Sequence, residues 1–215
     1  MKPGSSTRKL LEISGAPLCG GNPNVPEVLL RKCSPDLAAE YLKLLEGKNG
    51  FFAFESALHA FPAGKATAGY DLENWNRPTG WIADYGDAAR DYLFFAEDVF
   101  GEQFAIRGDG IYRFDPENGT GTLLTNSIEQ WAERILEDYH TETGYKLAHE
   151  WQMKNGRLDA KNRLTPKKPF ILGGEFDIDN LFALDAERAM RLRADISRQI
   201  KDLPPGSQVE IRITE

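Results

Sequence analysis

Short strand-length segments that alternate with turn signals constrain the fold of this chain more than any other feature. Residues 92–96, 103–107 and 111–114 are rich in the aromatic and aliphatic side chains that favour strands. Turn signals that contain glycine bound them at residues 100–101, 108–110 and 115–119. Connections this short join neighbouring antiparallel strands, so the pattern predicts a β-meander. Residues 51–61 and 123–124 are expected to add further extended chain.

Helix signals flank the predicted sheet. Ser34 and Pro35 combine a capping hydroxyl with proline at the first helical position, which predicts a helix over residues 35–46. Ser127 and Gln130 form a capping-box pattern ahead of a continuous apolar stripe. Further helices are expected near residues 72–75, at 145–153 and at 186–201. Helices around an antiparallel or mixed meander indicate an α+β fold.

Composition divides the chain into three parts. Residues 1–33 are expected to form a loose lead-in, residues 34–142 an α+β core, and residues 143–215 an extension that packs on the core as one compact unit. The extension is predicted to have the order β-β-α-β, closed by a strand at residues 208–213. Residues 154–168 hold six basic side chains without interleaved aromatic residues, so they are expected to form an exposed linker rather than a nucleic-acid site.

Negative charge is concentrated in the middle of the chain. The net charge is −7, and residues 71–142 hold 16 acidic against 5 basic side chains. A field of that sign repels nucleic acid and anionic membranes and attracts basic partners. The charge fits either an ordinary solubility surface or a surface that faces a partner, and the sequence leaves both interpretations open.

The cysteines and the first residues bear on the compartment. Cys19 and Cys33 form neither a disulfide framework nor a CxxC motif. No apolar run is long enough to span a membrane, and the start of the chain lacks the apolar stretch of a secretory signal. We therefore expect reduced thiols in a cytoplasmic protein.

Motifs for catalysis and for metal binding are incomplete. His149-Glu150 starts like a zinc-protease helix, but Met153 stands where the second histidine would be. The Gly108–Gly110 segment lacks the third glycine of a dinucleotide loop, and the chain has neither a P-loop nor a GxSxG elbow. We therefore expect no catalytic residues, no metal and no cofactor. An enzyme with a pocket assembled from distant positions is one alternative.

Three carboxylates, Glu97, Asp98 and Glu102, flank the expected turn at Gly101. A glycosidase-like pair would need two acids at a fixed separation across a pocket, one of them with a raised pKa. Adjacent acids on a turn are usually solvated, so we expect these to face a partner rather than to catalyse a reaction. Glu55 is expected only to lie on the polar side of its strand.

A series of motifs runs through residues 34–140. A capped helix leads into residues 50–54, a strand of the F-A-x-D type follows at 95–98, and an F-D-P turn lies at 114–116. The series also includes Gly101, Phe104, Gly119, Ser127, Glu129 and Trp131. In this order the motifs resemble the SUKH superfamily of the Smi–Knr type. Residues from Tyr145 onward resemble the extension of longer bacterial members.

This resemblance implies binding rather than catalysis. Bacterial members of the superfamily are mostly immunity proteins that neutralise a cognate toxin, and many such toxins are nucleases with a basic cleft. The acidic residues 71–142 would complement such a cleft in charge. The predicted partner-binding residues are Trp75, Trp81, Asp84, Tyr85, Asp87, Asp91, Glu97, Asp98 and Glu102. Eukaryotic members resemble signalling adaptors, so a regulatory scaffold is a second alternative.

Overall fold

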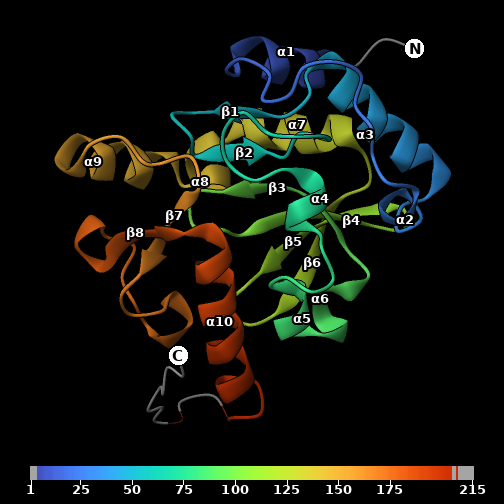
Figure 1. Cartoon of the computed structure of the whole chain (residues 1–215). Helices are drawn as coiled ribbons and strands as arrows, with labels where there is room; N and C mark the ends of the chain where they lie inside the picture. The colour runs from blue at the N-terminus through green and yellow to red at the C-terminus, as the bar shows by residue number, and fades with distance from the viewer. Residues whose placement is uncertain (1–3, 205–206, 208–215) are drawn as a thin grey trace.

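The computed structural model, which describes residues 4–204 and 207, is built around a six-stranded sheet. Each strand pairs antiparallel with its neighbour in sequence (Figure 1). The strands are β1 (Phe51–Ala53), β2 (Leu58–Ala60), β3 (Leu93–Asp98), β4 (Gln103–Arg107), β5 (Gly110–Asp115) and β6 (Thr120–Thr125). The predicted α+β fold and its meander are thus confirmed.

The segment 51–61 differs from its prediction, because it is a hairpin of β1 and β2 rather than one extended strand. Phe54, Glu55 and Ser56 reverse the chain with φ angles of 52°, 53° and 72°. Glu55 therefore lies in a turn, not on the polar side of a strand. Its carboxylate is 2.8 Å from Nδ1 of His149.

Both faces of the sheet are covered. On one face, Trp131 of helix α7 (Ile128–Glu137) packs against Phe95, with ring centroids 5.0 Å apart. On the other face, Trp81 packs against Phe94 at 4.7 Å. Neighbouring residues of a strand point to opposite faces, so β3 places aromatic side chains in both layers and is buried along its whole length.

Helices α3 (Pro35–Gly47) and α1 (Ser5–Ile13) pack with α7 on the first face. The predicted caps of α3 and α7 are present. The backbone N–H of Leu37 donates to Ser34 Oγ at 3.4 Å, and that of Gln130 donates to Ser127 Oγ at 3.1 Å. These caps satisfy N–H groups that have no partner within the first turn of a helix.

The interpretation of residues 1–33 as a loose lead-in is wrong where the structure describes them. They contain α1 and the short α2 (Glu27–Leu30), and Leu10 and Leu11 are buried in the main core. At the start of α1, Glu129 of α7 accepts hydrogen bonds from the backbone N–H groups of Ser6 and Thr7, at 2.7 and 3.1 Å. Apolar burial and this capping carboxylate hold α1 on α7.

Helix α8 (Tyr139–Thr143) joins the core to the extension, which starts with α9 (Tyr145–Asn155) and continues with a second, two-stranded sheet. Its strands are β7 (Asn162–Pro166) and β8 (Leu181–Asp185), and the turns η1 (Phe170–Leu172) and η2 (Ile178–Asn180) lie between them. Residues 154–168 are therefore not an exposed linker, because they contain β7, in which Arg163, Leu164 and Thr165 are buried. The strand predicted at 208–213 lies outside the described residues.

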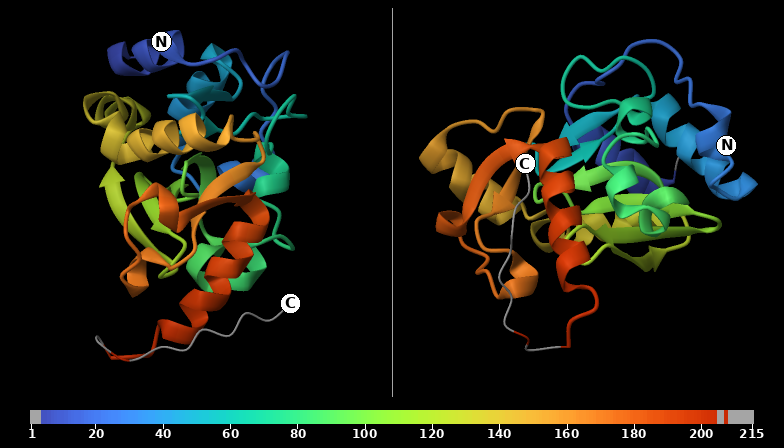
Figure 2. Two further views of the ribbon diagram at one scale, coloured as in Figure 1. Left: turned by 90° about the vertical axis from the view of Figure 1, so that its left-hand side faces the viewer. Right: turned by 60° about the horizontal axis from the view of Figure 1, so that its bottom comes forward.

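Helix α10 (Ala186–Ile200) follows β8 and lies beside α5 (Ile82–Tyr85). Two more short helices, α4 (Leu72–Trp75) and α6 (Asp87–Arg90), belong to the same region of the core. Helices α1 and α10 lie on opposite sides of the sheet in Figures 1 and 2. Within residues 4–204, no helix is long and apolar enough to cross a membrane.

Candidate functional site

The contact between the core and the extension, called the seam below, is lined by buried charges. Glu97 of β3 lies 2.6 Å from Nη2 of Arg163 in β7 and 3.1 Å from Nδ1 of His59 in β2. All three side chains are almost completely buried. Because a carboxylate only accepts hydrogen bonds, Nδ1 of His59 carries the proton.

The protonation states of this group follow from burial and charge. Burial lowers the pKa of His59 to about 4, so its imidazole is neutral at pH 7. Burial by itself would raise the pKa of Glu97, but Arg163 and the hydrogen bond from His59 outweigh it and hold the pKa below its usual value. The seam therefore encloses one ionised pair, Glu97 and Arg163.

Four of the predicted partner-binding residues are enclosed in the same way. Trp75, Trp81, Glu97 and Asp98 are each at most 2% exposed. Trp75 Nε1 donates to Gln103 Oε1 at 2.7 Å inside the core. The prediction that these four side chains face a partner is wrong for this structure, because helices and the extension cover the sheet on both sides.

Asp84 and Tyr85 face the extension. Asp84 pairs with Arg191 of α10 at 2.9 Å. The Tyr85 hydroxyl lies 2.7 Å from the carbonyl oxygen of Pro116 and 3.1 Å from that of Met190. Much of the acidic surface expected to meet an external partner is therefore occupied by the chain's own extension.

Asp87 and Asp91 are exposed, as predicted, although Asp87 already pairs with its neighbour Arg90 at 2.7 Å.

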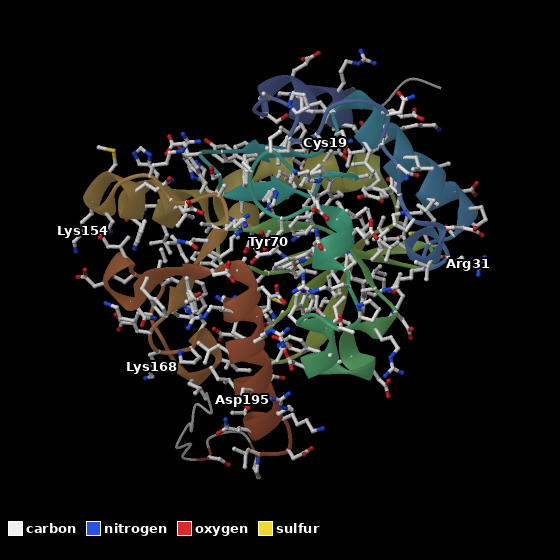
Figure 3. The ribbon with its side chains drawn as sticks, in the orientation of Figure 1. Cys19, Arg31, Tyr70, Lys154, Lys168 and Asp195 are labelled. Atoms are coloured by element: carbon white, nitrogen blue, oxygen red, sulfur yellow. The ribbon has the colours of Figure 1, made fainter. Side chains whose placement is uncertain are left out.

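A further contact across the seam joins Tyr70 to Asp185. The Asp185 carboxylate accepts a hydrogen bond from the Tyr70 hydroxyl at 2.8 Å, and Tyr70 lies at the centre of the molecule in Figure 3.

The turn between β3 and β4 contains a second group of charges. Asp98 Oδ1 accepts hydrogen bonds from the backbone N–H groups of Phe100 and Glu102, at 2.8 and 2.9 Å. Arg113 lies 3.3 Å from Glu102 and 2.6 Å from Glu142, so it is held more closely by Glu142. Burial raises the pKa of Asp98 well above its usual range, and it also raises the pKa of Glu102.

Glu102 also lines a pocket of about 220 Å³ at the seam, called the seam pocket below. The pocket is formed by the β3–β4 turn, the turn that follows β5, η1 and its following loop, and α10. Its walls carry carboxylates, aromatic rings and one arginine: Glu102, Asp115, Glu117, Phe100, Phe170, Phe176 and Arg193, with Pro116, Asn118 and Ile171. It combines acidic and apolar chemistry in one site.

The polar side of the seam pocket is short of positive charge. Burial raises the pKa of both Glu102 and Glu117, and repulsion from Asp115 adds to this, while Arg193 acts on both in the opposite direction without cancelling the effect. Arg193 is 2% exposed, and its Nε and Nη1 atoms have no hydrogen-bond partner among the described residues. Glu117 Oε2 accepts from the backbone N–H of Ile171 at 2.8 Å, which fixes one of its two oxygens.

The apolar side of the seam pocket is partly open to solvent. Phe170 and Phe176 are stacked, with centroids 4.0 Å apart and planes 6° apart. Phe100 meets Phe170 edge-on at 5.5 Å. Phe176 is 66% exposed and Ile171 is 44% exposed. Large apolar side chains beside a pocket are typical of binding surfaces.

The part of the chain that the structure describes contains neither a group of metal ligands nor a disulfide. No three His, Cys, Asp or Glu side chains among those residues are grouped so that they could hold a metal ion. Cys19 and Cys33 are both free thiols. Burial raises the pKa of Cys33 to about 12, so this thiol is protonated and unreactive at pH 7.

Sequence reasoning found Glu102 but missed the other side of the seam pocket. One signal was available for Arg193: it follows Ala189 by four residues and precedes Ile196 by three, so it lies on the same apolar face of the helix predicted at 186–201. An arginine on a buried face requires acidic or acceptor partners. Phe176 had no comparable signal, because it lies just beyond Gly173 and Gly174 in a segment without periodicity.

The structure is that of an α+β protein with a pocket lined by acidic and aromatic side chains where core and extension meet. No protein-family model matches the chain, and no curated protein matches it. Among solved structures, the chain is similar to the crystal structure of Atu4351 from Agrobacterium tumefaciens, with 16% identity and a TM-score of 0.53 over 86% of each chain. At that identity the similarity shows the fold alone.

Proposed function

We propose that this chain is a non-catalytic, cytoplasmic binding protein that neutralises a toxin domain with a basic surface, as an immunity protein does. The seam pocket carries the proposal, because three carboxylates lie beside the exposed apolar side chains of Phe176 and Ile171. Acidic groups steer a basic partner to the surface, and apolar side chains at the centre of an interface supply affinity. The resemblance of residues 34–140 to the SUKH superfamily supports the same function.

A solubility role for the acidic middle of the chain accounts for less of its geometry. Glu97, Glu142 and Asp84 are held by arginines within the chain, so they add little free charge to the surface. In the seam pocket, by contrast, the one ion pair of Glu102 among the described residues is the longer 3.3 Å contact with Arg113. Glu102 and Glu117 lie next to the exposed apolar side chains of Phe176 and Ile171, where a partner would use both.

One observation favours an enzyme as the second candidate. The raised pKa values of Glu102 and Glu117 are of the kind that acid–base catalysis uses. The residues that line the pocket include no His, Ser, Cys or Lys, so a catalytic role would rest on carboxylates alone. Turnover of a small substrate that is abolished by Glu117→Gln would favour this candidate over binding.

The test is a rescue experiment in a host cell. The candidate toxin is the C-terminal domain of the neighbouring large open reading frame. It is expressed alone, together with the wild-type form of this protein, and together with the Phe176→Ala or Glu117→Lys variant of this protein. We expect the cells to die with the toxin domain alone, to survive with the wild-type protein, and to die with either variant. The control Glu133→Lys, at an exposed position of α7, should still rescue them. Death with the wild type and no complex on a sizing column would count against the proposal.

A further inference from the structure

We propose that the seam pocket binds one arginine of the partner chain, whose guanidinium pairs with the carboxylates and whose main-chain carbonyl accepts hydrogen bonds from Arg193. This inference rests on the proposed function and names the group that the pocket recognises. It follows from the charge of the pocket, its aromatic wall and the buried arginine in it.

The charge balance of the pocket requires a cation. Glu102, Asp115 and Glu117 line the pocket together with Arg193, and a second cation, Arg113 at 3.3 Å from Glu102, is held more closely by Glu142 at 2.6 Å. Burial is the main cause of the raised pKa values of Glu102 and Glu117, and repulsion from Asp115 adds to it; a further positive charge in the pocket would offset that repulsion.

The shape and the wall of the pocket favour a guanidinium. A volume of about 220 Å³ suits one side chain, since pockets for drug-sized ligands are usually about 300–1,000 Å³. The ring of Phe176, which is stacked on Phe170 and 66% exposed, offers a face to a cation. A planar guanidinium stacks flat on such a face while the N–H groups of its edge donate in pairs to carboxylates, a geometry that an ammonium group does not offer.

Arg193 sets the second requirement. Its side chain is 2% exposed, and two of its nitrogens lack a hydrogen-bond partner among the described residues. Buried donors without acceptors are costly, so a ligand that supplies an acceptor is favoured. A lone guanidinium ion has no acceptor, whereas an arginine within a polypeptide carries a carbonyl oxygen close to its side chain.

The same chemistry already operates along the seam within the chain. Arg163 pairs with Glu97 at 2.6 Å, and Arg191 pairs with Asp84 at 2.9 Å. The core surface therefore binds guanidinium groups of the extension at two positions. At the seam pocket the corresponding carboxylates Glu102 and Glu117 have no such close arginine partner within the described residues.

The experiment compares two isosteric probes on the full-length protein. Nα-acetyl-arginine N-methylamide carries the cation and the carbonyl groups, and Nα-acetyl-citrulline N-methylamide carries the carbonyl groups without the charge. Binding is followed by NMR chemical shifts of the backbone amides around residues 100–102, 115–119 and 170–176. We expect saturable binding of the arginine probe, and binding of the citrulline probe at least about tenfold weaker.

Two variants and a matched control test the assignment to the pocket. Glu117→Gln keeps an acceptor for the Ile171 N–H but removes a charge, and Phe176→Leu removes the exposed ring. Each variant is expected to bind the arginine probe about fivefold or more weakly than the wild type. Glu133→Gln removes a charge from the exposed face of α7 and should leave binding unchanged. Circular dichroism checks that each variant is folded.

The outcomes separate this inference from the proposed function. Equal binding of both probes, no saturable binding, or binding that Glu117→Gln leaves unchanged would overturn the arginine site. Rescue of the host cell together with any of these results would keep the proposed function and reject the inference. A specific arginine site combined with failure of rescue would keep the inference and reject neutralisation of that toxin.

Discussion

At the scale of single residues, Glu97 shows that a carboxylate close to a turn in the sequence can be completely buried in the structure. Its oxygens contact Arg163, His59 and Gln103, which come from three different strands of two sheets. The ion pair excludes water completely, so each of its charges depends on the other for compensation.

Loss of the Glu97 charge should therefore destabilise the fold. Glu97→Gln leaves Arg163 buried with no ionised partner at 2.6 Å, and breaking a buried pair typically costs about 3–5 kcal/mol. Urea denaturation measures the change in unfolding free energy. Asp87→Asn, in the exposed pair with Arg90, is the control and should change stability little. A small effect of Glu97→Gln would mean that the pair is not closed to water.

His59 predicts a dependence of stability on pH. Its pKa is about 4 in the folded state, below the unfolded value of 6.5, so the unfolded chain binds more protons between these two values. Its contribution is present above pH 6.5 and is lost as the pH falls towards 4, on the order of 3 kcal/mol in all. Glu102 and Glu117, with raised pKa values, contribute with the opposite sign.

A variant isolates the histidine from these opposing carboxylates. His59→Gln keeps an N–H donor for Glu97 but does not titrate. As the pH falls from 6.5 to 4, the unfolding free energy of the wild type should decrease relative to that of the variant. A difference that stays constant over this range would show that His59 is not buried in its neutral form.

At the scale of elements, helix α7 illustrates what a sequence pattern can and cannot predict. Glu129, Glu133 and Glu137 form one row of like charges four residues apart; only Glu129 belongs to the motif series of residues 34–140, and nothing in the sequence predicts that it caps another helix. In the structure Glu129 caps α1, while Glu133 and Glu137 are exposed. The hydrogen bonds from Ser6 and Thr7 outweigh the effect of burial and lower the pKa of Glu129.

We therefore expect the glutamates of α7 to respond differently to substitution. Glu129→Ala should lower the unfolding free energy by about 1 kcal/mol, because the first turn of α1 loses its acceptor. Glu133→Ala on the same helix is the matched control and should have little effect. Thermal unfolding of both variants measures the difference. Equal effects would mean that α1 does not depend on this cap.

The elements that sequence did predict share a local cause. The meander follows from turns within a few residues of each strand, and the caps of α3 and α7 follow from Ser34 and Ser127. Strand β7 was missed because its burial comes from contacts with distant residues: Leu164 donates its backbone N–H to Val99, and Arg163 meets Glu97. The seam pocket was missed for the same reason, since its walls come from four separate segments.

At the scale of the whole molecule, the seam determines whether core and extension behave as one unit. A second apolar cluster crosses the seam, with Val99 and Phe100 from the core and Leu158, Leu164 and Leu181 from the extension. If either part unfolds first, the other part loses these buried apolar contacts, and one charge of the Glu97–Arg163 pair loses its partner.

We therefore expect the whole chain to unfold in a single transition. Far-UV circular dichroism, which follows all helices, and tryptophan fluorescence, which includes Trp75, Trp81 and Trp131 of the core, should give coincident urea curves. Leu164→Ala in β7 removes a fully buried side chain, so it should lower the unfolding free energy by about 2–5 kcal/mol. Both curves should then move together to lower urea concentration. Leu123→Ala, at a position that is 51% exposed, is the control. Two separate transitions, with Leu164→Ala moving only one, would show that the extension folds independently and that the seam pocket opens without unfolding of the core.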